Sequence, residues 1–260
     1  MENAKKRVVI KIGTSTLTYE GGRLNIRRFE KLVKIVSDIR NSGIEVVLVS
    51  SGAIGVGMGK VGISSRPGCI REKQALASIG QCQLMNFYST LFETYGHTVA
   101  QILLTRDVTD KELMRANAKN TFETLFSLNA IPIVNENDTI STEQIEFGDN
   151  DTLSAMVAEL VEADLLVLLS DIDGLYDKDP HAFDDAKIIP EVNEIDDSIR
   201  SLAGGSGTSL GTGGMVTKIC AAEIAMAAGI DMIITNGETP EILYDIFDGK
   251  KVGTLFKKKL

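Results

Sequence analysis

Short apolar runs that alternate with helix-like segments constrain the fold of this chain more than any other feature. Six runs are rich in Val, Ile and Leu and have the length of buried strands. Strands that alternate with helices form a mostly parallel sheet covered by helices. The sequence therefore predicts an α/β fold with strands at Val8–Ile12, Val46–Val49, Val99–Leu104, Ile131–Val134, Leu165–Leu169 and Met232–Thr235.

Helical periodicity fills most of the gaps between these runs. Asn25 is a plausible N-cap, the segment after it places apolar residues on one face, and Gly43 is a typical stop. Such a helix packs its apolar face on a sheet. Further helices are predicted at Glu72–Phe92, Arg115–Leu128, Thr152–Val161 and Met215–Ala228.

The composition is that of a globular protein with a sizeable core, because 43% of its 260 residues are hydrophobic. No apolar stretch has the length of a signal peptide or a membrane span, so we expect a cytoplasmic protein. A net charge of −9 disfavours extended contact with nucleic acid. The three cysteines have no CxxC spacing, which argues against a zinc site or a disulfide framework, and we predict buried thiols at Cys69, Cys82 and Cys220.

Three glycine-rich turns adjoin the predicted elements: "KIGTS" (11–15), "SSGAIGVGMG" (50–59) and "GTGGMVTK" (211–218). Ligands of parallel sheets bind at the carboxyl ends of the strands, where such turns gather. A glycine-rich loop before a helix can also hold a phosphate through backbone N–H groups. The composition of residues 203–214 equally fits a flexible linker, so both interpretations stay open for that segment.

Several familiar catalytic motifs are absent. Gly59 and Lys60 are followed by Val61, so the segment is not a P-loop. "GMGKVG" (57–62) matches the dinucleotide pattern but begins well past the preceding strand, and we interpret it as a chance match. His97 and His181 lie in no triad or metal spacing, which disfavours nucleophilic and zinc-dependent hydrolysis.

Two lysines stand beside the glycine-rich turns. Lys11 interrupts a strand that is otherwise apolar, and Lys218 lies in the helix that follows the last turn. Each could be a surface lysine whose head group reaches water. Their positions favour phosphoryl transfer instead, in which the protein chiefly positions the reactants and neutralises the charge of the moving phosphoryl group.

Asparagine and aspartate residues gather after one predicted strand and before the next helix. Helix caps and turns account for single residues of this kind but not for six together: Asn135, Asn137, Asp138, Asp149, Asn150 and Asp151. "SDIDGLYDKDP" (170–180) also opens at the end of a strand. It is either a polar turn set by Gly174 and Pro180 or a further part of a site.

Taken in order, "KIGTS", "VSSGA", "VNEND", "GDND", "LLSDIDGLY" and "GTGGMVTK" resemble the amino acid kinase family, and within it the branch of glutamate 5-kinases. The resemblance implies a three-layer α-β-α sandwich with a largely parallel sheet, formed by a single domain over residues 1–260. Residues 1–165 would bind the substrate and residues 166–260 the nucleotide. The implied reaction transfers the γ-phosphoryl group of ATP, with Mg²⁺, to the γ-carboxylate of L-glutamate, the first step of proline biosynthesis.

The resemblance also implies roles for individual residues. Lys11 and Lys218 would stabilise the transition state, and Asp151 would orient them. Glutamate would be bound by Ser51, Gly52, Ala53, Asn135, Asp138 and Asn150. Besides the two lysines, ATP would be bound by Gly13, Thr14, Ser15, Ser170, Asp171, Thr212, Gly213, Gly214, Met215, Val216 and Thr217. No metal ligand is assigned, because ATP phosphates would hold most of the Mg²⁺ coordination.

The expected partners follow from the same resemblance. They are L-glutamate and ATP, a second copy of the chain in a homo-oligomer, and functional coupling to glutamate-5-semialdehyde dehydrogenase. Many glutamate 5-kinases carry a C-terminal PUA domain, and with Leu260 soon after "GTLF" we expect the form without it. Another amino acid kinase, acting on aspartate, N-acetylglutamate, carbamate or UMP, stays open as an alternative. So does an amino-acid sensor without turnover.

Overall fold

β1 (Arg7–Ile12) lies in the interior of an eight-stranded sheet of order β3-β4-β2-β1-β5-β7-β8-β6. The computed structural model describes residues 6–19, 21–65, 67–105, 108, 111–141, 150–180, 182–203 and 214–258. The other strands are β2 (Glu45–Val49), β3 (Val99–Leu104), β4 (Ile131–Glu136), β5 (Leu165–Ser170), β6 (Glu191–Val192), β7 (Asp231–Asn236) and β8 (Thr254–Phe256).

The sheet is parallel except where β8 runs antiparallel to β7. β1 pairs with β2 on one side and β5 on the other, and Lys11 stands opposite Val49 and Leu168. The strands from β3 to β7 therefore end at one edge of the sheet, where ligands of such folds bind. The six strands predicted from the apolar runs are all present.

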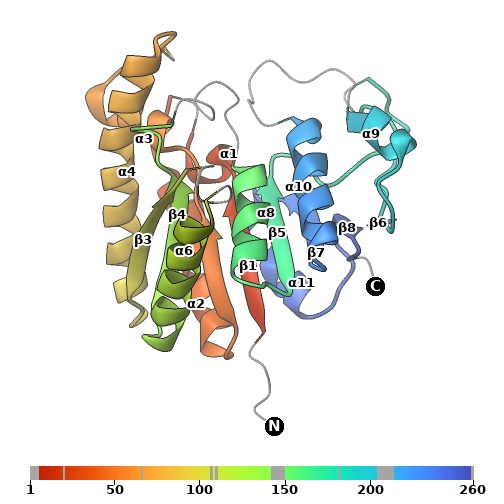
Figure 1. Cartoon of the computed structure of the whole chain (residues 1–260). Helices are drawn as coiled ribbons and strands as arrows, with labels where there is room; N and C mark the ends of the chain where they lie inside the picture. The colour runs from red at the N-terminus through yellow and green to blue at the C-terminus, as the bar shows by residue number, and fades with distance from the viewer. Residues whose placement is uncertain are drawn as a thin grey trace.

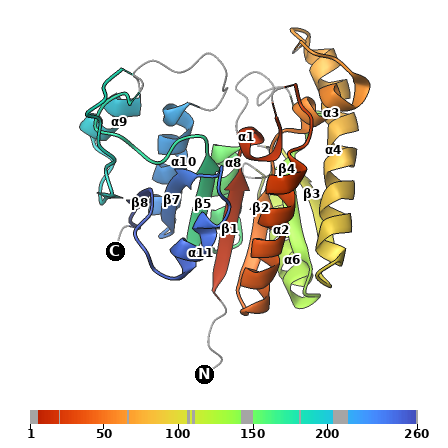
Figure 2. The same ribbon diagram turned by 180° about the vertical axis from the view of Figure 1, so that it is seen from behind.

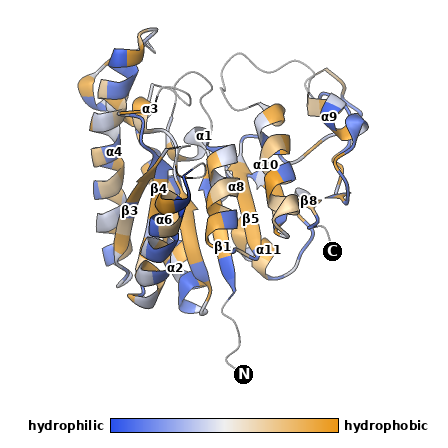
Figure 3. Ribbon diagram, in the orientation of Figure 1, coloured by the Kyte–Doolittle hydropathy of each residue, from blue (hydrophilic) through white to orange (hydrophobic). Residues whose placement is uncertain are grey.

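Helices cover both faces of the sheet, as two opposite views show (Figures 1 and 2). One face carries α6 (Glu112–Ser127), α8 (Asp151–Leu160) and α10 (Met215–Ala227), and the other carries α2 (Ile26–Asn41), α4 (Ile70–Glu93) and α11 (Ile242–Phe247). A separate apolar cluster fills each interface, and β5, which contributes to both, has the hydrophobic colour in Figure 3. The predicted three-layer sandwich is confirmed.

The helix after Asn25 forms for the predicted reasons. The Asn25 side chain accepts a hydrogen bond from the backbone N–H of Arg28 at 3.2 Å, as an N-cap does. Phe29, Leu32 and Val36 are buried on the face toward the sheet. Gly43, with φ of +94°, allows the chain to turn back directly into β2.

The prediction of a glycine-rich turn over residues 50–59 is wrong, because a helix, α3 (Ala53–Val61), begins after Gly52. Its glycines serve helix packing. A Cβ atom on Gly57 would lie 2.0 Å from the carbonyl oxygen of Leu76, and one on Gly80 would lie 1.7 Å from that of Ala53. α3 and α4 thus pack backbone to backbone, and low helix propensity is offset by this contact.

Two further outcomes differ from the sequence predictions. All three cysteines are exposed, so the prediction of buried thiols is wrong; each lies on or beside a helix at a solvent-facing position. The sequence also gave no signal for the short elements α1 (Thr14–Leu17), α9 (Asp197–Ala203), α11, β6 and β8. Elements of two to seven residues are too short to display a periodicity.

Among the described residues, the helices lack the combination of length and apolar character that a membrane span requires.

Candidate active site

A fully buried carboxylate stands between two buried ammonium groups at the carboxyl edge of the sheet. The Nζ atom of Lys11 lies 2.6 Å from Oδ1 of Asp151, and the Nζ atom of Lys218 lies 3.1 Å from Oδ2 of the same carboxylate. The exposed fractions of the three side chains are 5%, 0% and 3% for Lys11, Asp151 and Lys218. The three residues identified in separate motifs are therefore brought together.

Each member of this triad stands at the end of a regular element. Lys11 lies near the carboxyl end of β1, Asp151 is the first residue of α8, and Lys218 lies in the first turn of α10. The two helices pack side by side over the sheet and begin at the same edge (Figure 1). Their N-terminal ends carry a partial positive charge, which suits a carboxylate and an incoming phosphate.

Thr217 links the triad to the turn before α10. Its hydroxyl lies 3.1 Å from Oδ2 of Asp151 and 2.8 Å from the carbonyl oxygen of Gly214, and it can donate to only one of them at a time. Its backbone N–H also donates to the Gly214 carbonyl. Gly214 and the exposed Val216 frame this first turn with Met215, whereas Thr212 and Gly213 lie outside the described residues.

The formal charge of the three side chains is +1. A buried ion pair that loses one partner is costly, so the carboxylate is needed to hold two ammonium groups close together. Two ammonium groups held close together at the start of two helices form an environment that suits an anionic ligand. Such an arrangement can stabilise a phosphoryl group in transfer.

The predicted phosphate-binding turn after β1 lies in contact with the neighbouring strand β5. The backbone N–H of Gly13 donates to the carbonyl oxygen of Leu169 at 3.0 Å, and a Cβ atom at Gly13 would lie 3.1 Å from that oxygen. Thr14 and Ser15 follow as the exposed first residues of α1. The guanidinium of Arg28 donates to the carbonyl oxygen of Ser15 at 3.1 Å and fixes the turn from behind.

A second polar cluster links the ends of β2 and β4 to the start of α8. The side-chain nitrogen of Asn150 donates to the carbonyl oxygen of Ser50 at 2.5 Å and to Oδ1 of Asn135 at 2.7 Å, and lies 3.3 Å from the Ser51 hydroxyl. Asn135 in turn donates to Oε1 of Gln81 at 2.7 Å. The side-chain oxygen of Asn150 has no hydrogen-bond partner among the described residues, which leaves an acceptor at this cluster.

Gly52 connects this cluster to α3. Its φ of +90° favours glycine, and it is the N-cap residue from which the helix starts at Ala53. A Cβ atom at Gly52 would lie 3.3 Å from the Thr14 side chain, so the turn after β2 passes close to the turn after β1. The two predicted ligand-binding turns are thus neighbours.

Asp138 is the acidic residue that the sequence predicts for the glutamate site. It is half-buried and makes no hydrogen bond or ion pair with the described part of the chain. Burial raises its pKa from the ordinary value to about 6. A carboxylate in this state gains from a cationic partner such as an ammonium group.

On the other side of β1, Ser170 ends β5 and its hydroxyl donates to the exposed Asp171 at 3.0 Å. The Ser170 carbonyl oxygen accepts from the backbone N–H of Gly237, after β7. These residues therefore share the carboxyl edge with the triad.

The sequence analysis missed Gln81 and Tyr88, which support the polar cluster from α4. Tyr88 is buried and its hydroxyl lies 3.1 Å from that of Ser50. Gln81 occupies the buried face of α4 with Leu84 and Tyr88. A polar residue on the apolar side of a helix was the signal available in the sequence.

Comparison with known proteins identifies the family. The sequence profile of the amino acid kinase family matches residues 6–236. A protein of Clostridium perfringens named "Glutamate 5-kinase" is 57% identical over 258 residues, which cover 98% of this chain and 96% of the relative. A Listeria innocua protein of the same name is 54% identical over 258 residues, covering 98% of this chain and 94% of the relative.

Two solved structures share the fold at low sequence identity. UMP kinase from Ureaplasma parvum has a TM-score of 0.67 at 14% identity, covering 98% of this chain and 100% of its own. Carbamate kinase from Giardia lamblia, bound to AMP-PNP, has a TM-score of 0.66 at 18% identity, covering 100% of both chains.

Proposed function

We propose, since this chain belongs to the amino acid kinase family, that it transfers the γ-phosphoryl group of ATP to the γ-carboxylate of L-glutamate. The product is L-glutamyl 5-phosphate, and the reaction is the first step of proline biosynthesis. The relatives named "Glutamate 5-kinase" match over nearly their whole length, which supports glutamate over the acids used by other members of the family.

The observation that carries the mechanism is the buried contact of Asp151 with Lys11 and Lys218. In the proposed reaction an oxygen of the γ-carboxylate attacks the γ-phosphorus of ATP, and the bond from that phosphorus to the bridging oxygen of ADP breaks. The two ammonium groups stabilise the charge on the transferring phosphoryl group. Asp151 holds both ammonium groups in place before the substrates arrive, so that little reorganisation is needed during the reaction.

The polar cluster around Asn150 supports a glutamate site on the substrate side of β1. We assign the α-ammonium group to the Asp138 carboxylate and to the side-chain oxygen of Asn150, for which no partner is found among the described residues. Asn135 orients Asn150, and the turn of Ser51, Gly52 and Ala53 supplies the neighbouring wall. In this proposal residues 1–165 bind glutamate and residues 166–260 bind ATP, with the triad between them.

The nucleotide side of the proposal uses the ends of β5 and the start of α10. Ser170 and Asp171 flank ATP on one side, and Gly214, Met215, Val216 and Thr217 flank it on the other. Thr14 and Ser15 offer backbone N–H groups to the phosphates, and Gly13, whose own N–H is bonded to Leu169, forms the start of this turn without a side chain. Thr212 and Gly213 are assigned to the same loop by the family resemblance alone.

Mg²⁺ is expected to be held mainly by the ATP phosphates. Within the described residues no group of three or more His, Cys, Asp or Glu side chains is arranged to bind a metal ion. When bound, Mg²⁺ neutralises negative charge on the phosphate oxygens.

An assay with hydroxylamine tests the proposed reaction, because hydroxylamine converts an acyl phosphate into a stable hydroxamate. Mg-ATP with L-glutamate should yield hydroxamate, whereas N-acetylglutamate should not, since acetylation removes the cation assigned to Asp138. Aspartate, carbamate and UMP complete the panel. Comparable rates with glutamate and N-acetylglutamate would contradict the assignment, and glutamate binding without turnover would favour the sensor.

The product also suggests a partner. Acyl phosphates hydrolyse and cyclise readily, so a reductase such as glutamate-5-semialdehyde dehydrogenase should consume the product promptly. We propose functional coupling to that enzyme and a homo-oligomeric state for this chain. Light scattering of the purified protein tests the second point, and trapping of product in a coupled assay tests the first.

A further inference from the structure

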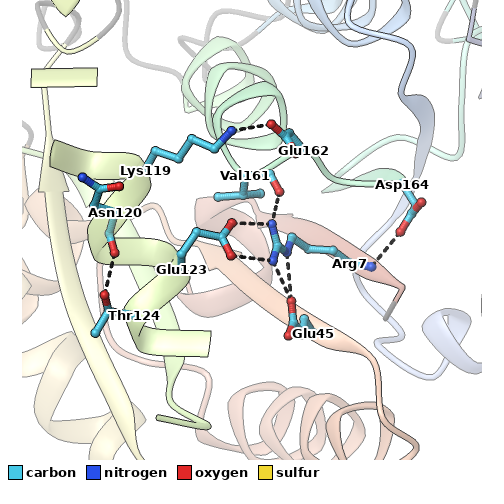
Figure 4. A network of polar contacts seen from close by, with 9 residues as sticks. All are labelled: Arg7, Glu45, Lys119, Asn120, Glu123, Thr124, Val161, Glu162 and Asp164. Atoms are coloured by element: carbon cyan, nitrogen blue, oxygen red, sulfur yellow. Dashed lines mark hydrogen bonds and ion pairs between the residues drawn. The ribbon is translucent and has the colours of Figure 1, made fainter. Parts of the chain in front are cut away.

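Arg7 is held by four groups at the opposite end of β1 from the triad, and Figure 4 shows three of them, Glu45, Glu123 and Val161. Its Nε and Nη2 atoms donate to Oε2 of Glu45 at 3.0 and 2.8 Å, and its Nη1 atom donates to Oε1 of Glu123 at 2.9 Å. Nη1 also donates to the carbonyl oxygen of Val161. The guanidinium carbon lies 4.2 Å from the ring centroid of Phe126.

The hydrogen bond to Val161 links Arg7 to the C-terminal end of α8. Val161 is the C-cap residue of this helix, where carbonyl groups lack partners within the helix and carry a partial negative charge. A guanidinium group satisfies such a carbonyl and interacts favourably with the helix dipole. Arg7 therefore binds one end of α8, and Asp151 is the other end.

Arg7 and Lys11 lie on the same face of β1, because side chains four positions apart in a strand point the same way. Four residues of strand span about 13 Å. The ten steps from Asp151 to Val161 span about 15 Å of helix. These lengths are similar, so β1 contacts both ends of α8. Lys11 pairs with Asp151 at the N-terminal end, and Arg7 donates to Val161 at the C-terminal end.

The surroundings of Arg7 restrict its movement. Burial alone would lower the pKa of its guanidinium, but the carboxylates of Glu123 and Glu45 outweigh this effect and raise the pKa above its ordinary value. Glu45 begins β2 and Glu123 belongs to α6, so these two elements fix the guanidinium group that binds α8. A planar donor held in this way defines a single position for the helix end.

We propose that Arg7 is a positioning residue that sets the position of α8 along its axis and so places the Asp151 carboxylate between Lys11 and Lys218. The catalytic consequence rests on the proposed function, whereas the structural consequence does not. Loss of the contact between Arg7 and Val161 should loosen the first turn of α8 and displace Asp151. This displacement should reduce the rate of phosphoryl transfer more than it weakens substrate binding.

The test compares Arg7→Met with the matched control Arg115→Met. Arg115 also binds α8, through a half-exposed ion pair with Glu159 in the last turn of the helix, but among the described contacts it does not bind the C-cap carbonyl oxygen of Val161. Two other variants replace Arg7→Met if that variant does not fold. Arg7→Lys keeps the charge but loses the planar group of hydrogen-bond donors. Glu123→Gln removes one of the charged groups that fix Arg7.

Hydrogen exchange of the protein without ligands gives the first readout. Amide exchange in the first turn of α8 should become at least tenfold faster in Arg7→Met and should stay unchanged in Arg115→Met. In Glu123→Gln the exchange should accelerate by a smaller factor. An exchange rate in this turn that is unaltered by Arg7→Met and Arg7→Lys would overturn the proposal. Hydrogen exchange therefore tests the positioning role of Arg7 whether or not glutamate is the substrate.

Kinetics give the second readout, with hydroxamate formation by the unaltered protein as the separate check on the proposed function. In Arg7→Met, kcat should fall by about tenfold to a hundredfold with KM for ATP and glutamate within about twofold. In an Asp151→Asn background the same change should have little further effect on kcat. Equal losses in both backgrounds would show that Arg7 does not act through Asp151, and would refute the positioning role.

Discussion

The ammonium nitrogen of Lys218 lies 3.1 Å from Oδ2 of Asp151, although the two residues are 67 positions apart in the chain. α8 and α10 bring them together, because each helix begins at the carboxyl edge of the sheet and presents its first turn there. The geometry of this contact leads to predictions about rate, stability, pH dependence and packing.

Lys218→Ala should lower kcat by about 10²–10³, or roughly 3–4 kcal/mol, with a much smaller effect on KM for ATP. The reason is that the lysine is proposed to act on charge that develops during transfer. Lys11→Ala should behave similarly, and the double variant should lose much less than the product of the two single losses. Steady-state kinetics measure these values, and the exposed Lys250→Ala serves as the control. A folded Lys218→Ala enzyme with near-normal kcat would defeat this mechanism.

Asp151→Asn should destabilise the folded chain as well as lower kcat. The change leaves two buried ammonium groups beside each other without their shared counter-charge. Breaking a buried pair in this way costs about 3–5 kcal/mol. Urea denaturation followed by circular dichroism measures the loss, and Asp245→Asn, which breaks an exposed pair with Lys250, should cost less than about 1 kcal/mol. Equal stabilities of the two variants would contradict the buried-pair argument.

The KM for glutamate should rise as the pH falls below about 6. The Asp138 carboxyl binds the α-ammonium group only when ionised, and burial has raised its pKa to about 6. At pH 5 about a tenth of the carboxyl groups remain ionised, so KM should increase by roughly tenfold over its value at pH 7.5. Initial rates at varied glutamate and saturating ATP give the profile.

Asp138→Asn supplies the control for that profile. The amide keeps the size of the side chain but loses its charge, so KM for glutamate should rise by about tenfold to a hundredfold at neutral pH, which is roughly 1.5–3 kcal/mol. Between pH 5 and 7.5 its KM should then be nearly constant. A variant with an unchanged KM would move the ammonium contact to another residue.

Gly57→Ala should destabilise the packing of α3 on α4, by about 1–3 kcal/mol, because its Cβ atom would lie 2.0 Å from a backbone oxygen of Leu76. Since α3 starts directly after Gly52, KM for glutamate should rise as well. Gly55→Ala in the same helix is the matched control. Its nearest neighbour would be 3.9 Å away, so it should be neutral or stabilise by up to about 1 kcal/mol. Similar melting temperatures for the two variants would rule out the packing argument.

The sequence by itself determined the six longer strands, most of the longer helices and the family. Apolar runs such as those in β1 and β5 are local patterns, and the position of Lys11 in one of them, beside a glycine-rich turn, already marked it as a candidate for phosphoryl transfer. The N-cap at Asn25 is equally local, since donor and acceptor are three residues apart. Features of this kind depend on neighbours within one or two turns, so a single sequence displays them.

Only the tertiary structure decided which partners those residues meet. α3 is a helix because its glycines pack against the backbone of α4, a gain that lies outside the segment itself and reverses its poor local propensity. Gln81 joins Asn135 and Asn150, and Arg7 joins Glu123 and Val161, across distances that no local pattern encodes. The packing of the elements determines these contacts, because buried polar groups form hydrogen bonds with the groups that the fold brings next to them.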